Sequence, residues 1–321
     1  MPKYLKWLIG LLAAIFAVFS VLFLTSGQAQ IPPIINFIFN IGSPKKMQTG
    51  LLEVRLNEYG KDLQARSTVP IKGGNVAGAT FLEIGVYTNR YKPHVHFRHG
   101  GQLLDLGVAR AVMLTQDSGE KEPIQSFDIS TDDIESPKEP RPSPAWDDRD
   151  RQVYARIKSL INRIDAAGWK RYLNPEEPRL SGEVTYFAST DSGYESNYQD
   201  PNFDFDFETW KKTGYSLTWR WYLDSAFLTL DYTKGDLDST LRIVAKAAGE
   251  IYLHYDPQKS VPFLGTYQRG KAAYIAKLPE FAALRQKKEA AAIAAGVAIM
   301  SDWVDIPVAS MQMPAQTGLA P

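Results

Sequence analysis

The chain has 321 residues, and its 36 basic residues (Lys and Arg) balance its 36 acidic residues (Asp and Glu), so the formal net charge is zero. A neutral chain without a basic stripe offers no electrostatic footprint for nucleic acid, and we expect no nucleic-acid partner. Cysteine is absent, which excludes disulfides, thiol nucleophiles, cysteine-ligated zinc and a lipid anchor attached through cysteine. The aromatic content of 12% favours a packed core over disorder.

The first segment predicts a membrane anchor. Trp7 to Leu24 runs for 18 residues without a charged side chain, which is close to the ~20 residues that a helix needs to cross the hydrocarbon core. Lys3 and Lys6 precede it, so the positive-inside rule places the N-terminus in the cytoplasm. We therefore predict a signal anchor over residues 1–30, with a single pass through a bacterial inner membrane and the body in the periplasm. A cleaved signal peptide and a buried terminal helix are the alternatives.

Residues 45–116 have the pattern of a small mixed β region. Apolar and polar residues alternate over 51–59, which predicts a half-buried strand, and 79–91 is a second strand candidate. The apolar stretch 101–115 fits either a strand or a helix. Residues 117–143 combine acidic residues with several prolines, which predicts a solvated linker. An acidic docking segment for a basic partner is the alternative.

Residues 144–321 predict an α+β domain, with an antiparallel sheet, packed helices and helices at the C-terminal end. Ser143 followed by Pro144 is a favourable helix start, and Gly168 is placed to end that helix. Residues 214–232 have the pattern of a β-hairpin with a polar tip at Asp224 and Ser225.

Three further stretches complete the expected domain. Residues 250–256 predict a strand, and 271–303 predict helical structure that breaks or starts at Pro279. In DPNFDFDFE, residues 200–208, carboxylates alternate with phenylalanines. This favours a strand edge over a calcium site, because the stretch lacks the glycine and the glutamate spacing of a calcium loop.

The sequence PHVHFRHGG contains three of the four histidines, His94, His96 and His99. On a strand, His94 and His96 point to the same face, which is a geometry that can hold one metal ion. The stretch resembles the metal-binding sequence of metallo-β-lactamase-fold hydrolases, but Arg98 stands where that family has a ligating aspartate, and only His254 remains downstream. We therefore expect a histidine cluster without metal, and no cofactor. A structural or adventitious metal site through His94 and His96 is an alternative.

A second resemblance lies in residues 168–232. The stretches GWKRYLNPEEPRLSGE (168–183) and FETWKKTGYSLTWRWYLDSAFLTLDY (207–232) are similar to a pattern in uncharacterised proteobacterial proteins. Many of these proteins are anchored in the inner membrane and encoded beside antibacterial effectors, notably type VI secretion lipases. The resemblance implies an immunity or accessory protein and no enzymatic residues.

Within this stretch, Arg179 lies among prolines and glycine, where a bidentate bond to a carboxylate would lock a turn-rich connection. Four tryptophans are expected in the core: Trp169, Trp210, Trp219 and Trp221. The alternative is that Arg179, Trp210, Trp219 and Trp221 form an exposed patch for a protein partner.

These observations predict a membrane-anchored periplasmic binding protein, not an enzyme, that binds and neutralises an antibacterial effector. An effector-loading or envelope-assembly factor is the first alternative. A metal-dependent hydrolase that uses His94 and His96 is the second. The identity of the partner, the oligomeric state and cleavage of the N-terminal segment stay open.

Overall fold

The computed structural model describes residues 48–305, apart from 77–78, 85–90, 117–122, 132–133, 135–136, 140–141, 188–192, 195–197, 201–202, 214–215, 235–238, 249–251, 253, 259–263, 302 and 304. The chain divides into two compact units, residues 1–46 and 47–321, and the described residues belong to the second. The anchor predicted at 1–30 lies outside the described residues. None of the described helices has both the length and the apolar character that a membrane span requires.

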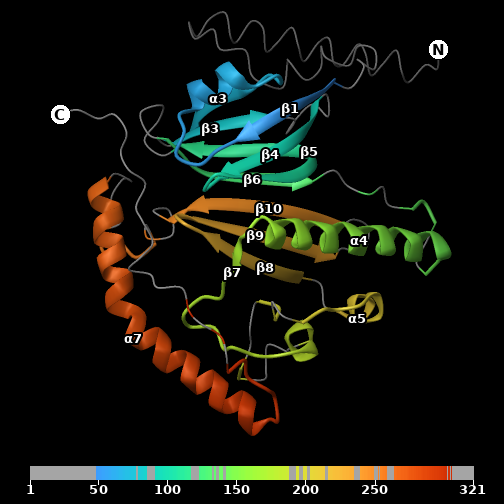
Figure 1. The fold of residues 1–321 in the computed structure, drawn as a ribbon, viewed down its shortest axis with the longest axis vertical. Coiled ribbons are helices and arrows are strands. Elements are labelled where there is room, and N and C mark those ends of the chain that lie inside the picture. The colour runs from blue at the N-terminus through green and yellow to red at the C-terminus, as the bar shows by residue number, and fades with distance from the viewer. Residues whose placement is uncertain are drawn as a thin grey trace, which may run out of the picture. The chain divides into compact units, whose positions relative to one another are not determined.

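A ten-stranded sheet dominates the second unit, with few helices among the described residues, and the predicted α+β class is confirmed to that extent (Figure 1). The strand order is β1-β4-β5-β6-β10-β9-β8-β7, while β3 pairs with both β2 and β5. Among the described pairs only β1 and β4 run parallel. The strands are β1 (Gln48–Val54), β2 (Lys72–Val76), β3 (Ala79–Ile84), β4 (Tyr91–His99), β5 (Gln102–Gln116), β6 (Ile124–Thr131), β7 (Lys170–Arg171), β8 (Ser216–Leu223), β9 (Ala226–Lys234) and β10 (Ser239–Ala247).

The helices are α3 (Gly60–Arg66), α4 (Pro144–Ala166), α5 (Phe207–Lys212), α7 (Leu264–Ala294) and the 3-10 helix η2 (Glu183–Tyr186). The start predicted for α4 is confirmed, with Ser143 extended at the N-cap and Pro144 in the first turn. The end is confirmed as well, because Gly168 has a φ of 83°, a backbone conformation that glycine adopts without strain.

The middle of the sheet differs from the prediction of a linker over 117–143. Residues Ile124–Thr131 form β6, which pairs with β5 on one side and β10 on the other. The side chains of Ile124, Phe127 and Ile129 are buried there. The strand was not predicted because its short alternation of buried and polar residues lies between acidic and proline-rich stretches. As a result, one sheet continues from the predicted 45–116 region into the predicted 144–321 region.

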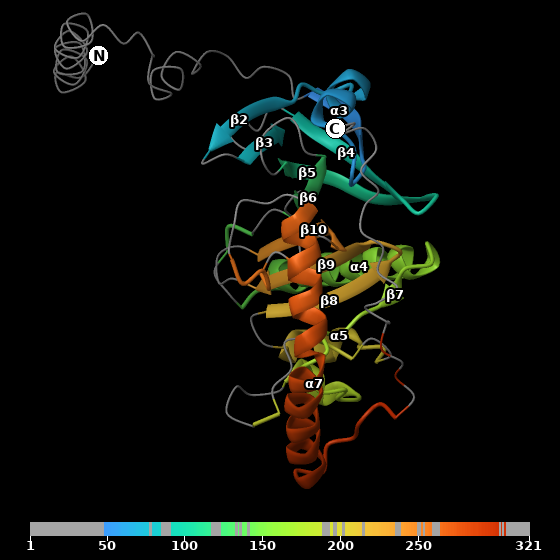
Figure 2. The ribbon, with the colours of Figure 1, turned by 90° about the vertical axis from the view of Figure 1, so that its left-hand side faces the viewer.

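Strand alternation divides the half of the sheet formed by β8, β9 and β10 into two faces. The predicted hairpin is confirmed, with β8 and β9 joined at Asp224 and Ser225. One face joins the buried side of α4 in the main core, through Trp219, Trp221, Leu228, Leu230 and Ile243. The other face packs Tyr222 and Phe227 with Tyr274 of α7. Figures 1 and 2 show α4 over one side of these strands and α7 running past β10, β9 and β8.

Three local predictions are wrong. Pro279 lies inside α7 and does not break it, because this position is exposed, where water can satisfy the carbonyl that loses its helical partner. The strand predicted over 250–256 is instead turn and helical structure at its described residues, where Asp256 pairs with Arg269 of α7. The strand edge predicted over 200–208 is absent from its described residues: 203–206 are irregular, and the carboxylate of Asp206 accepts from the N–H of Thr209 and caps α5.

Candidate functional site

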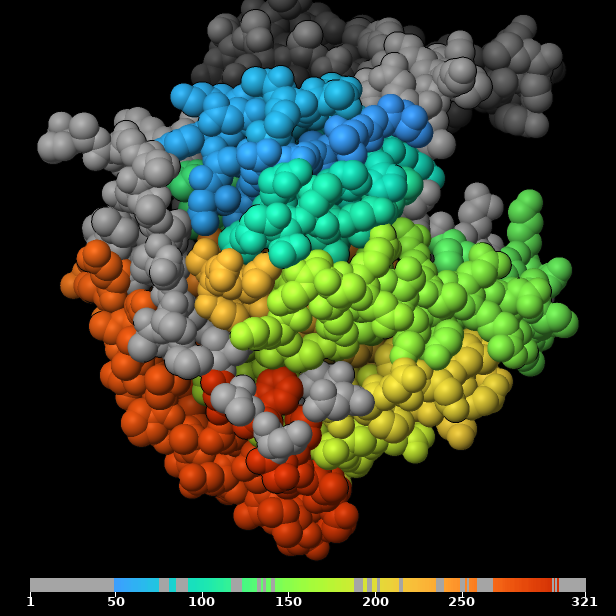
Figure 3. Space-filling view, in the orientation of Figure 1, coloured from blue at the N-terminus to red at the C-terminus, as the bar shows by residue number. Residues whose placement is uncertain are grey.

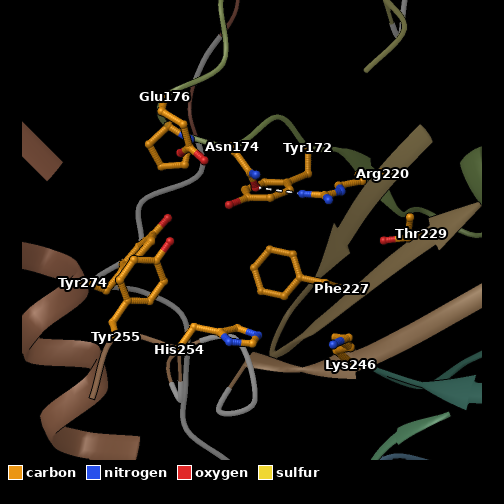
Figure 4. A pocket seen from close by; sticks show the side chains of 11 residues that line it. Tyr172, Asn174, Glu176, Arg220, Phe227, Thr229, Lys246, His254, Tyr255 and Tyr274 are labelled. Carbon is orange, nitrogen blue, oxygen red and sulfur yellow. Dashed lines mark hydrogen bonds between the residues drawn. The ribbon is translucent and has the colours of Figure 1, made fainter. Parts of the chain in front are cut away.

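A pocket of about 240 Å³ lies between the sheet face of β8, β9 and β10 and helix α7 (Figure 4). Its walls come from those strands, from the segment after β7, from the turn at His254 and from α7. The lining residues are Tyr172, Asn174, Pro175, Glu176, Arg220, Phe227, Thr229, Lys246, His254, Tyr255 and Tyr274.

The pairing of β8, β9 and β10 determines which side chains form the floor of this pocket. Arg220 lies opposite Thr229, and Phe227 lies opposite Lys246. Because side chains alternate along a strand, these residues point away from the face that packs on α4. In Figure 4, Phe227 lies at the centre of the view, with Tyr255 and Tyr274 on one side and Arg220 on the other.

Aromatic rings form much of the wall. Tyr172 meets Phe227 edge to face, with ring centroids 4.8 Å apart, and Tyr255 meets Tyr274 at the same separation. Burial raises the pKa of Tyr274 to about 12, and it raises the pKa of Tyr172, which also hydrogen-bonds with Tyr274. Near neutral pH these phenols are therefore protonated and can act as hydrogen-bond donors.

The charged side chains of the pocket favour binding of an anionic group. Arg220 and Lys246 are cations, and Glu176 is the single carboxylate among the lining residues. The guanidinium of Arg220 is held in place, because its Nη1 donates to Oδ1 of Asn174 at 3.0 Å and its carbon lies 4.1 Å from the ring centroid of Tyr198. A fixed arginine beside aromatic walls suits a carboxylate attached to an apolar or aromatic group.

The predicted histidine cluster is only partly assembled. His94 and His96 share one face of β4, with ring centroids 5.2 Å apart, and Nε2 of His94 lies 2.6 Å from Oδ1 of Asp105 on β5. His99 lies on the other face, where it stacks on Phe97 and its Nε2 bonds the carbonyl of Leu223 at 3.1 Å. Burial lowers the pKa of His99, which favours the neutral ring as a donor to that carbonyl.

Asp105, which the sequence analysis missed, replaces His99 as the third member of this cluster. A signal for it exists in the sequence. Gly100 and Gly101 form a two-residue turn with φ values of 54° and 79°. A two-residue turn fixes the register of the strands on either side of it, so that the fourth residue before the turn, His96, lies opposite the fourth residue after it, Asp105.

Arg179 is buried and clamps the chain, and its predicted bidentate bond to one carboxylate is wrong. Its Nη1 donates to the carbonyls of Asn174 and Glu177 at 2.9 and 2.6 Å, while Nη2 pairs with Asp305. Burial alone would raise the pKa of Asp305, but Arg179 and Arg285 together hold it below its usual range. The clamp thus ties the chain near Asp305 to the loop that leads into the pocket.

The tryptophans predicted to be core residues are confirmed as such. Trp169, Trp210, Trp219 and Trp221 belong to the main hydrophobic cluster, and each is at most 4% exposed. Trp221 also donates from Nε1 to Oδ1 of Asp165 at 2.6 Å. The proposed exposed patch of Arg179, Trp210, Trp219 and Trp221 does not exist in this fold, since all four side chains are buried.

Sequence reasoning did not single out the pocket. Tyr172, Lys246 and Tyr274 come from three segments that lie far apart in the chain, and no spacing in the sequence links them. The sequence does contain one indication of the pocket. Arg220 and Thr229 alternate with core residues along the predicted hairpin, so both lie on the face opposite the core.

Comparison with protein-family profiles, curated proteins and solved structures found no match for this chain. We therefore derive its function from its own residues and their geometry.

Proposed function

We propose that this chain is a membrane-anchored periplasmic binding protein that neutralises an antibacterial effector, as immunity proteins do. One observation carries the proposal. Seven of the eleven side chains that line the pocket come from residues 168–232, the stretch that resembles effector-associated proteins: Tyr172, Asn174, Pro175, Glu176, Arg220, Phe227 and Thr229. The segment with the resemblance is thus also the segment that builds the cavity.

The chemistry of the pocket supports a protein partner. Its volume of about 240 Å³ is below the ~300–1,000 Å³ of pockets for drug-sized ligands. Such a volume suits one or two inserted side chains better than a large cofactor. Aromatic and arginine anchors in a pocket are typical of the residues that dominate protein–protein binding energy. We infer that the partner inserts an acidic side chain next to an apolar or aromatic one.

The first test is whether an effector gene lies beside the gene for this chain, and its absence would count against the proposal. The second test uses the effector that such a gene encodes. Cells that express that effector in the periplasm should be rescued by the full chain, and the two proteins should form a complex measurable by calorimetry. Failure of both rescue and binding would disprove the proposal.

A charge reversal in the pocket tests where the partner binds. Lys246→Glu places a carboxylate where we expect the acidic side chain, so affinity should fall by roughly tenfold or more through like-charge repulsion. Lys287→Glu makes the same change on the exposed side of α7, outside the pocket lining, and should leave affinity within about twofold. Equal effects of the two variants would refute the pocket as the binding site.

A further inference from the structure

We propose that His94, His96 and Asp105 bind one divalent transition-metal ion, with Zn²⁺ as the best match. This site is separate from the pocket and from the proposed function. It lies on the face of β4 and β5 that carries the side chains of His94 and His96. Figure 3 shows residues of β1 and β4 (blue and teal) reaching the molecular surface next to α4 (green).

The positions of the possible ligand atoms support the site. One ligand atom from each of the three residues can be chosen so that all lie within 4.8 Å of one another. In a tetrahedral zinc site with bonds of about 2.1 Å, ligand atoms lie roughly 3.4 Å apart. Small side-chain rotations would therefore bring the three ligands into position, and the ion would replace the bond between His94 and Asp105.

The identity of the donors selects the metal. Two imidazoles and one carboxylate suit zinc and its neighbours in the first transition series, whereas calcium and magnesium prefer oxygen ligands alone. Three protein ligands also leave a fourth position open to water. His94 and Asp105 are each 45% exposed at the side chain, so an ion has access from solvent.

Backbone irregularity creates the arrangement. The pairing of β4 with β5 shifts at Val95 and His96, and Gly107 on β5 has a φ of 81°. Through this bulge the carboxylate of Asp105, which lies opposite His96, also reaches His94. The N–H of Gly107 donates to Oδ1 of Asp105 at 2.8 Å and orients the carboxylate, as outer-shell partners of metal ligands do.

Neighbouring arginines are the main opposing feature. Arg98 shares the face of His94 and His96, but its Nε and Nη2 donate to the carboxylate of Glu53 at 3.1 and 3.3 Å, so its charge is compensated. Arg163 lies closer to the site, with Nη1 3.4 Å from Oδ2 of Asp105. Because this cation offsets part of the ligand charge, we expect moderate affinity.

The test is calorimetric titration of the chelator-treated full chain with zinc chloride near neutral pH. We expect one ion per chain and at least a roughly tenfold loss of affinity in His94→Ala, His96→Ala and Asp105→Asn, each of which removes a ligand. His254→Ala is the matched control, since His254 is exposed and outside the cluster, and it should bind zinc as the parent does.

Circular dichroism of each variant without zinc verifies that the fold is kept, which the exposure of these side chains leads us to expect. The proposal is overturned if the parent shows no saturable binding. It is also overturned if folded His94→Ala and Asp105→Asn chains bind as the parent does, or if His254→Ala alone abolishes binding.

Discussion

Glu53 joins two arginines on the sheet face of β1 and β4. Its carboxylate accepts from Nε and Nη2 of Arg98 and from Nε of Arg55 at 2.9 Å. Hydrogen bonds from Arg98 first, and then from Arg55, lower the pKa of Glu53 to about 2. The same carboxylate compensates the charge of the arginine nearest in sequence to the histidine pair, so one residue links stability to the proposed metal site.

The pH dependence of stability should reveal this group. A carboxyl whose pKa is lower in the folded than in the unfolded chain stabilises the fold above its unfolded value of 4.5, and the stabilisation disappears as pH falls toward about 2. Glu53→Gln should therefore lose up to ~1 kcal/mol of unfolding free energy near pH 7, the size typical of exposed ion pairs, and little near pH 2. Urea denaturation of both chains across this range measures the difference. A gap that does not change with pH would contradict the assignment.

One glycine, Gly270, allows helix α7 to pack closely against the chain at Tyr252. A Cβ added to Gly270 would lie 2.1 Å from the carbonyl oxygen of Tyr252, so the helix backbone approaches the chain there more closely than any side chain allows. Tyr274 follows one turn later on the same side of α7 and forms part of the pocket wall. A larger residue at position 270 would therefore displace the helix that carries this wall.

Gly270→Ala should therefore destabilise the protein, although alanine favours helix by up to ~1 kcal/mol. The clash involves backbone atoms, so α7 must shift, and we expect a net loss of ~1–3 kcal/mol in thermal or urea denaturation. Binding of the partner should weaken as well, since Tyr274 moves with the helix. Gly74→Ala is the control, because its Cβ would meet nothing within 4 Å. Equal stability of the two variants would rule out close packing at Gly270.

The continuous sheet predicts how the described part of the chain unfolds. β6 pairs with β5 and β10, so strands from both sides of the predicted linker share one hydrogen-bonded ladder. Their side chains also share one core, in which Phe97 of β4 meets Phe127 of β6 with ring centroids 4.6 Å apart. A unit of this kind should unfold cooperatively.

We expect one denaturation transition for the described part of the chain. Tryptophan fluorescence reports mainly the 144–321 region, which holds six of the seven tryptophans, whereas circular dichroism reports all strands. The two signals should give the same midpoint in urea. Two separate midpoints would show that residues 45–116 and 144–321 fold independently.

Much of the local structure follows from the sequence. Ser143, Pro144 and Gly168 bound α4 because caps and glycine act within a few residues of the chain. The hairpin tip at Asp224 and Ser225 is local in the same way. The predictions fail where distant contacts decide, as at 250–256, where Arg269 of α7 holds Asp256 in a turn.

The sequence by itself determined that His94 and His96 share a face, and its Gly100-Gly101 turn pairs His96 with Asp105, because strand alternation and hairpin register depend only on neighbouring residues. Only the tertiary structure decided that Asp105 also reaches His94, since that contact depends on a bulge within the β4–β5 pair. The pocket was likewise decided at the tertiary level. Tyr172, Lys246 and Tyr274 are far apart in the chain, and they meet because α7 packs on the sheet face that α4 leaves open.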